Sequence, residues 1–214
     1  PVSDDRPTAV GRRGATGRLC AAGLCGYLLG TFPSSGLATN LAADGHDLLT
    51  EGSGNPGAAN AAQVLGRRWG LAVLVSDVAK GALAGVVGRS LAGDNGAYLG
   101  ATTAIAGHVV PVWRRGRGGK GVATSAGATL AVFPVYFPVD LAVTLVGALR
   151  HRRAEAATRL ACAVWVGTAV ASWRLRWPNG WGPDPGPGLP LFATVGSALV
   201  LAAFVRGRSR GVTA

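Results

Sequence analysis

The stretch 69-WGLAVLVSDVAKGALAGVVG-88 decides the fold class of this chain. It is an almost unbroken apolar run of about 20 residues, the length that an α-helix needs to cross the hydrocarbon core of a bilayer. Asp77 and Lys80 interrupt the run one helical turn apart. Ionisable side chains at that depth are costly unless they are paired or functional. We therefore expect a membrane-spanning helix that carries either a structural ion pair or a substrate contact.

Further apolar runs of this kind occur along the whole chain. The candidate spans are Leu19–Ala43, Trp69–Gly88, Ala97–Trp113, Val122–Val139, Leu141–Leu149, Leu160–Trp173 and Leu189–Val205. Leu141–Leu149 is too short to cross alone, and Leu160–Trp173 is marginal. Residues 122–149 could form a hairpin of kinked helices, or one span with a re-entrant piece. We predict an all-α, polytopic helical membrane protein with about seven transmembrane or re-entrant helices, of which five to seven cross the membrane.

The composition agrees with this class. The chain is 49% hydrophobic and only 14% charged, whereas a soluble domain carries about 25% charged residues. Its 34 glycines would let helix backbones approach closely. A soluble glycine- and alanine-rich protein is the alternative, but the apolar runs are too numerous for it. Cys20, Cys25 and Cys162 lie in apolar runs without metal-ligand spacing, so we predict buried small hydrophobes rather than disulfides.

The chain is strongly basic, with a formal net charge of +11. Such a charge suits nucleic acid or anionic lipid. Because the basic residues fall between apolar runs, we expect membrane lipids and no nucleic acid as partners. With seven crossings and an outside N-terminus, 13 of the 21 Lys and Arg residues would lie in inner loops and 7 on the outer side. The positive-inside rule then predicts a multi-pass protein of the cell membrane with a cytoplasmic active face.

Both ends of the chain are polar. We predict a flexible basic tail over residues 1–18, with a signal peptide as the alternative. Residues 19–205 would form a single transmembrane domain, and residues 206–214 a short basic C-terminal tail.

Two glycine-rich loops are predicted on the cytoplasmic face. In 52-GSGNPGAAN-60 the glycines allow positive φ and could turn backbone amides toward an anion, while Asn55 and Asn60 add side-chain amides. A tight turn between two helices is the structural alternative. The second loop lies in 116-GRGGKGVATSAG-127. It is not a Walker A motif, because Gly121 follows Lys120 where serine or threonine is needed.

The second loop nevertheless has the properties of a phosphate site. Gly118, Gly119 and Gly121 could form a nest of amides beside the Lys120 charge, and Thr124 follows one turn into the next helix. A basic anchor on lipid headgroups would explain the basic residues but not the glycines. His108 lies near the inner end of the third span, where it could contact a phosphate, shuttle a proton, or simply pack two helices. The sequence has no G-x-S-x-G nucleophile elbow and no cluster of metal ligands.

Five motifs occur in order with plausible spacing. They are 27-YLLGTFPSSG-36, 52-GSGNPGAANA-61, 77-DVAKG-81, 107-GHVVPVW-113 and 118-GGKGVAT-124. Together they resemble those of the bacterial integral-membrane acyl-phosphate:glycerol-3-phosphate acyltransferases, from about Tyr27 to Val205.

The resemblance implies a helical membrane enzyme, seven-spanning in the family. It would transfer a fatty acyl group from acyl phosphate to the 1-hydroxyl of glycerol 3-phosphate. The products would be 1-acyl-glycerol 3-phosphate (lysophosphatidic acid) and phosphate, in the first step of phospholipid biosynthesis. No cofactor, metal or acyl-CoA is implied, and a monomer is compatible with the reaction. The leaving group is already activated, so the protein need only position two anions.

The resemblance also implies a set of site residues. The catalytic residues would be Lys120, His108 and Thr31. The residues that shape the loops and bind substrate phosphates would be Gly118, Gly119, Gly121, Thr124, Ser53, Asn55, Asn60 and Lys80.

The chain departs from the family pattern at three places. Thr31 stands where the family's first motif has serine, and Leu49 stands where an arginine usually precedes the G-S-G-N loop. The segment 205-VRGRSR-210 replaces an H-R-E-N-like segment, although its arginines could substitute for the lost cation. A degenerate member that binds lipid phosphates without turnover is therefore one alternative. A small membrane transporter is another, but the polar residues cluster at one face.

Overall fold

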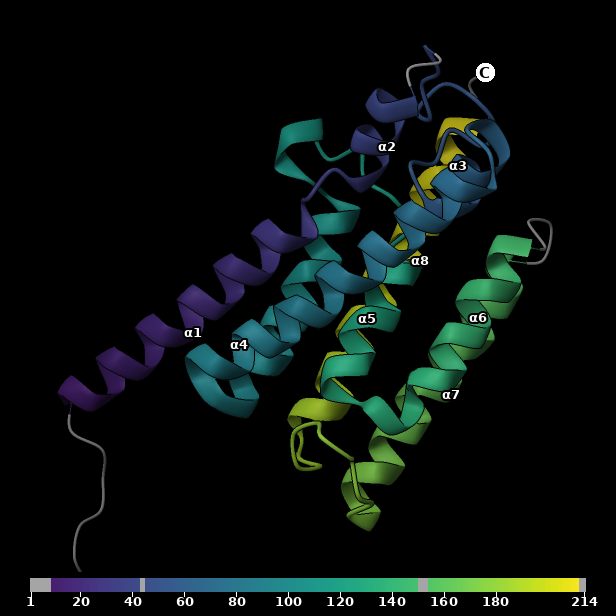
Figure 1. The fold of residues 1–214 in the computed structure, drawn as a ribbon. Helices are drawn as coiled ribbons and strands as arrows, with labels where there is room; N and C mark the ends of the chain where they lie inside the picture. The colour runs from purple at the N-terminus through teal and green to yellow at the C-terminus, as the bar shows by residue number, and fades with distance from the viewer. Residues whose placement is uncertain (1–8, 43–44, 150–153, 212–214) are drawn as a thin grey trace, which may run out of the picture.

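The computed structural model describes residues 9–42, 45–149 and 154–211, and the regular structure in these ranges is helical. The helices are α1 (Ala9–Gly30), α2 (Ser34–Ala42), α3 (Ala58–Val64), α4 (Arg67–Val109), α5 (Val122–Val132), α6 (Phe137–Leu149), α7 (Ala154–Leu175) and α8 (Gly188–Gly211), with two 3₁₀ turns, η1 (Val112–Arg114) and η2 (Pro134–Tyr136). The predicted all-α membrane fold is confirmed. Figure 1 shows α1 as a long arm beside α4, with α6 and α7 on the opposite side of the bundle.

Helix α4 is a hairpin of two arms rather than one rod. The chain reverses at Ala92 and Gly93, and Gly93 has φ 62° and ψ −153°, a conformation open only to glycine. Beside the turn, Gly88 and Gly96 bring their backbones together, so that a Cβ on either would overlap the other's carbonyl oxygen. The two arms match the predicted spans Trp69–Gly88 and Ala97–Trp113, although the second arm already ends at Val109.

Small residues bring α4 into close contact with its neighbours on both sides. The second arm packs on α1, and the first arm packs on α5. At each contact a Cβ in place of the glycine hydrogen would overlap backbone atoms of the partner helix. The glycines at these contacts are Gly26 against Gly100, Gly30 against Ala104, Gly107 against Tyr27, Gly127 against Val78 and Gly81 against Thr124. This is the packing mode that membrane helices use, and it accounts for much of the glycine content.

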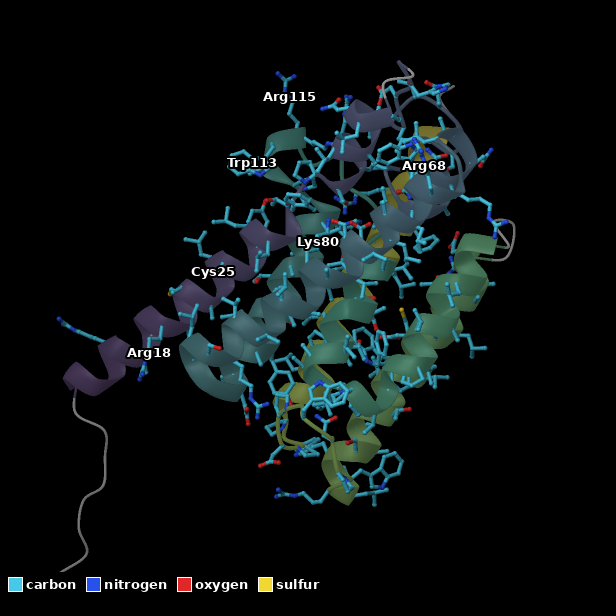
Figure 2. The ribbon with its side chains drawn as sticks, viewed as in Figure 1. Arg18, Cys25, Arg68, Lys80, Trp113 and Arg115 are labelled. Atoms are coloured by element: carbon cyan, nitrogen blue, oxygen red, sulfur yellow. The ribbon has the colours of Figure 1, made fainter. Side chains whose placement is uncertain are left out.

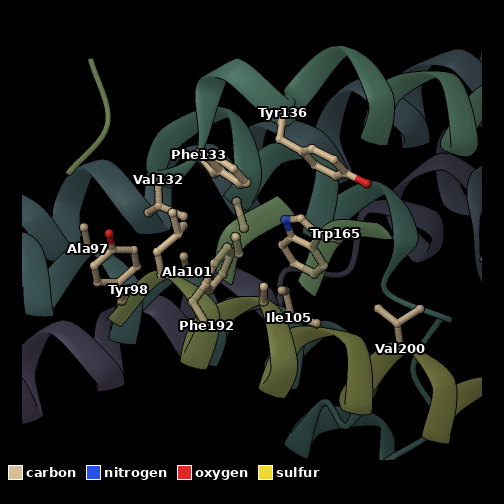
Figure 3. Close-up of a cluster of buried hydrophobic side chains, with 14 of the residues drawn as sticks. Ala97, Tyr98, Ala101, Ile105, Val132, Phe133, Tyr136, Trp165, Phe192 and Val200 are labelled. Atoms are coloured by element: carbon tan, nitrogen blue, oxygen red, sulfur yellow. The ribbon is translucent and has the colours of Figure 1, made fainter. Parts of the chain in front are cut away.

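The larger apolar side chains gather where α4, α5, α7 and α8 meet (Figure 3). Trp165 of α7 packs edge-on against Phe192 of α8, with ring centroids 5.2 Å apart. Phe133 and Tyr136 stack at 5.5 Å just after α5. These contacts fix α7 and α8 against the α4–α5 pair.

The N-terminal prediction is wrong in two respects. Residues 9–18 belong to α1, so this part of the predicted flexible tail is helical, and residues 1–8 lie outside the described residues. The predicted span Leu19–Ala43 is also not one helix, because α1 ends at Gly30 and α2 begins at Ser34. Pro33 explains the break, since it disfavours helical geometry at the residue before it.

The predicted boundaries also differ at the C-terminal half. Residues 122–149 form two short helices, of 11 and 13 residues, separated by η2 at Pro134. Helix α7 has 22 residues, about 33 Å, so the predicted span Leu160–Trp173 is too short. Helix α8 continues to Gly211, so most of the predicted tail at 206–214 is helical.

The cysteine prediction holds for one residue of three. Cys162 is buried, whereas Cys20 is exposed and Cys25 is half-buried on α1. Both lie on the helix that flanks the bundle, where one face contacts no other helix (Figure 1).

Candidate active site

A cavity lies at the end of the bundle where α1 ends, α2 begins and the second arm of α4 ends. It encloses about 260 Å³ of space that is partly open to solvent. The residues that line it are Gly30, Thr31, Phe32, Pro33, Ser34, Ser35, Pro56, Lys80, His108, Pro111, Arg114, Gly118 and Gly119. All five motifs therefore contribute to this cavity, the GSGNPG loop through Pro56.

One oxygen of Asp77 organises the deepest part of this site. The Ser34 hydroxyl donates to Asp77 Oδ1 at 2.6 Å, and Lys80 Nζ lies 2.9 Å from the same oxygen. His108 Nδ1 is 3.7 Å away, which is an electrostatic contact rather than a hydrogen bond. Lys80 also donates to the Phe32 carbonyl at 3.2 Å. Asp77 is 1% exposed and Lys80 5%, so the ionisable pair in the span forms a buried ion pair beside the cavity. Figure 2 marks Lys80 within the bundle.

Gly118 and Gly119 of the second loop lie so close to His108 that neither position has room for a side chain. A Cβ on Gly118 would overlap the His108 carbonyl oxygen, and a Cβ on Gly119 would overlap His108 Nε2. The Gly119 amide donates to the His108 carbonyl at 3.2 Å. This amide therefore has a protein acceptor in the structure, and its part in an anion nest stays a prediction. The two glycines let the loop lie directly on the imidazole.

The turn η1 covers the cavity from the side. Trp113 Nε1 donates to Thr31 Oγ1 at 3.0 Å, and that hydroxyl donates to the Leu28 carbonyl at 2.7 Å. The Thr31 hydroxyl therefore links η1 to the end of α1, and it both accepts and donates a hydrogen bond within the protein. Arg114 reaches inward, and its Nη1 donates to Ser35 Oγ at 3.2 Å. Sequence reasoning missed both Arg114 and Ser35 as cavity residues, because only the turn brings them together.

Asn60 organises the GSGNPG loop. Its Oδ1 accepts from the Ser53 amide at 2.8 Å, and its Nδ2 donates to the carbonyls of Leu48 and Glu51 at 3.1 and 3.0 Å. The side chain is buried and fully used by the loop backbone. Asn60, Ser53 and Asn55 are not among the residues that line the cavity.

The residues after Gly119 point away from the cavity. Lys120 Nζ lies 4.4 Å from the ring centroid of Phe204 on α8, a cation–π contact. Burial lowers the pKa of Lys120, and the charge of Glu155 partly opposes this. Gly121 has φ 83° and begins the turn into α5. Thr124 is completely buried where α5 packs on α4, and its hydroxyl has no hydrogen-bond partner among the described residues. Lys120, Gly121 and Thr124 are thus not among the residues that line the cavity with His108 and Lys80.

The cavity and its motifs agree with comparisons to known proteins. The model of the family described as glycerol-3-phosphate acyltransferase matches residues 20–210. The chain belongs to this family.

Curated members of the glycerol-3-phosphate acyltransferase family resemble part of the chain closely. The enzyme of that name from Synechococcus elongatus is 44% identical over 124 residues, covering 54% of this chain and 59% of the relative. The one from Exiguobacterium sibiricum is 39% identical over 130 residues, covering 61% and 62%. The alignments thus span about three fifths of the length of these relatives.

Solved structures extend the likeness to the whole fold. A crystal structure of PlsY, an integral membrane glycerol 3-phosphate acyltransferase, in its glycerol 3-phosphate form has a TM-score of 0.71 and 25% identity, covering 91% of this chain and 92% of that chain. The lysophosphatidic acid form has a TM-score of 0.65. The chain is accordingly a membrane protein of this family. Among the described helices, residues 67–114 and 188–207 are long and apolar enough to span a bilayer.

Proposed function

We propose that this chain transfers a fatty acyl group from acyl phosphate to the 1-hydroxyl of glycerol 3-phosphate, giving 1-acyl-glycerol 3-phosphate and phosphate. The observation that carries the proposal is the cavity itself. It combines Lys80, His108 and Arg114 with a glycine loop, at one end of a bundle of apolar helices. Both substrates carry phosphate and one carries an acyl chain, so a basic cavity at a membrane surface suits both.

The reaction needs little beyond positioning. The 1-hydroxyl oxygen would attack the acyl carbonyl carbon, a new ester bond would form, and the bond from that carbon to the phosphate oxygen would break. Cations beside the cavity would stabilise the charge that develops on the departing phosphate. We assign the hydroxyl proton to His108 Nε2, which lies against Gly119 at the cavity wall. Asp77, 3.7 Å from Nδ1, would favour the imidazolium that results.

The other predicted site residues take different roles in this proposal. Lys80 would hold Asp77 and the Phe32 carbonyl in place at the cavity wall, because its ammonium contacts both. Lys120 could reach a substrate only after leaving the Phe204 ring. Asn60 and Thr31 would shape the loop and the cavity wall rather than touch substrate.

The test is phosphate release from acyl phosphate by the purified protein in detergent. We expect release that depends on glycerol 3-phosphate and equals the 1-acyl-glycerol 3-phosphate formed. His108→Ala should lower kcat by at least about a hundredfold, on the scale of general-base catalysis. Arg115→Ala, at an exposed residue outside the cavity lining, is the control. No release under conditions where another family member is active would refute the proposal. Binding of glycerol 3-phosphate without turnover would indicate the non-catalytic alternative instead.

We also propose that the cavity end faces the cytoplasm and the N-terminus lies outside. The support is the basic character of this end, where Arg114, Arg115 and Arg117 lie close together in sequence. In a cysteine-free background, Arg115→Cys should react with a membrane-impermeant maleimide only after cell lysis. Arg176→Cys, after α7, should react in intact cells. The reverse pattern would refute the orientation.

A further inference from the structure

The net positive charge of the cavity comes from a residue outside the buried ion pair. Asp77 and Lys80 form a close pair at 2.9 Å, so their charges largely cancel at the cavity. The Lys80 ammonium is further occupied by the Phe32 carbonyl. An anion that enters the cavity would have to compete with Asp77 for Lys80. A separate cation is therefore needed to attract it.

Arg114 is that cation. It is half-buried at the cavity wall, and within the described ranges it takes part in no ion pair. The one hydrogen bond of its side chain in this part of the chain is donated by Nη1 to the Ser35 hydroxyl at 3.2 Å. A guanidinium has five N–H donors, so most remain for a ligand. Ser35 holds the group in place without neutralising it.

The chain also leaves room for the guanidinium at this position. Gly36 follows Ser35 on α2, and a Cβ on Gly36 would lie 2.6 Å from Arg114 Nη2. The planar group therefore rests over a residue that has no side chain. Its neighbour Arg115 has φ 50° and is exposed, and Figure 2 shows it pointing away from the bundle. The turn η1 thus directs one of two adjacent arginines inward.

We propose that Arg114 binds the phosphate group of a substrate, a phosphate monoester or acyl phosphate dianion, and sets the affinity of the cavity for it. This inference rests on the proposed function. Arginine suits the role because its rigid fork can donate two parallel hydrogen bonds to phosphate oxygens, which the ammonium of lysine cannot. The Ser35 hydroxyl and the absent side chain of Gly36 position the fork.

The experiment compares Arg114→Ala, Arg114→Lys and the control Arg115→Ala in phosphate-release assays with each substrate varied in turn. For Arg114→Ala we expect KM for one phosphate substrate to rise roughly tenfold to hundredfold, the loss of hydrogen bonds to a charged group. Arg114→Lys should recover only part of this loss, and Arg115→Ala should match the unmodified protein. A rise confined to glycerol 3-phosphate would identify the acceptor as the bound ligand, and a rise confined to acyl phosphate would identify the donor.

Gly36→Ala tests the geometry without removing the charge. It should displace the guanidinium and raise the same KM, while Gly207→Ala, where a Cβ meets open space, should not. Thermal melting in detergent checks that all variants fold. If Arg114→Ala changes neither KM more than Arg115→Ala does, the inference is refuted.

Direct binding separates this inference from the proposed function. Calorimetric titration with inorganic phosphate and with glycerol 3-phosphate needs no turnover. Weaker binding by Arg114→Ala than by Arg115→Ala would support the inference even if the protein released no phosphate. Equal binding by the two variants, or no binding by the unmodified protein, would overturn it.

Discussion

Replacing Asp77 with alanine would leave the buried Lys80 ammonium without its carboxylate. Lys80 is 5% exposed and lies 2.9 Å from Asp77 Oδ1. Removing one member of a buried ion pair typically costs about 3–5 kcal/mol, because the remaining charge is uncompensated. The Ser34 hydroxyl, which donates to the same oxygen at 2.6 Å, would lose its acceptor at a cost of about 1 kcal/mol more. We therefore expect a loss of about 4–6 kcal/mol in the free energy of unfolding.

The assay is equilibrium unfolding in mixed micelles of detergent and SDS, followed by circular dichroism. The chain provides its own control in the pair of Arg89 and Asp94, which lie 3.2 Å apart with side chains 45% and 46% exposed. Breaking such an exposed pair with Asp94→Ala should cost at most about 1 kcal/mol.

A double-mutant cycle completes the experiment. Asp77→Ala with Lys80→Met removes both charges, so the pair should cost less than the sum of the two single changes by at least about 2 kcal/mol. The reasoning is wrong if Asp77→Ala costs no more than Asp94→Ala, or if the two single effects simply add.

Three further outcomes follow from the structure. Asn60→Ala should cost about 2–3 kcal/mol and speed hydrogen exchange over residues 48–57, because it leaves loop backbone groups without partners; normal exchange there would contradict the loop assignment. Gly127→Ala should prevent normal folding, seen as loss of the monodisperse peak in gel filtration, because its Cβ would overlap the Val78 carbonyl. Glu51 has a lowered pKa because the Asp47 amide and His46 bond its carboxylate. Its contribution to loop order should therefore be present above about pH 4.5 and lost as the pH falls through the lowered pKa. Hydrogen exchange in the loop that does not depend on pH, after correction for the intrinsic rate, would refute this.

Much of the candidate site was predictable because membrane helices constrain where polar residues go. His108 lies near the end of one apolar run and Lys80 lies within another, and polar groups at such depths gather away from lipid. The structure brings both together with Gly118 and Gly119. The sequence pattern therefore identified the end of the bundle where the cavity lies.

The sequence pattern could not show the directions in which individual side chains point. Lys120 follows Gly119 directly, yet its ammonium lies on Phe204 of α8, because Gly121 turns the backbone at φ 83°. Arg114 and Arg115 look equivalent in sequence, and the turn η1 sends only Arg114 inward. A single sequence carries no signal for these rotations, because they depend on packing between helices that are far apart along the chain.

The hairpin within α4 links the geometry of the site to the turn at the other end of the bundle. Asp77 belongs to one arm and His108 to the other, and each lies about 23 Å along its helix from the reversal at Gly93. A small change of angle at the turn therefore becomes a larger displacement at the far end of each arm. A change of only 2° in the angle at Gly93 would move its far end by about 0.8 Å, which is enough to turn the 3.7 Å contact between His108 and Asp77 into a hydrogen bond. The close contact of Gly88 with Gly96 beside the turn holds the two arms together, so it helps to fix the spacing of Asp77 and His108 at the opposite end of the bundle.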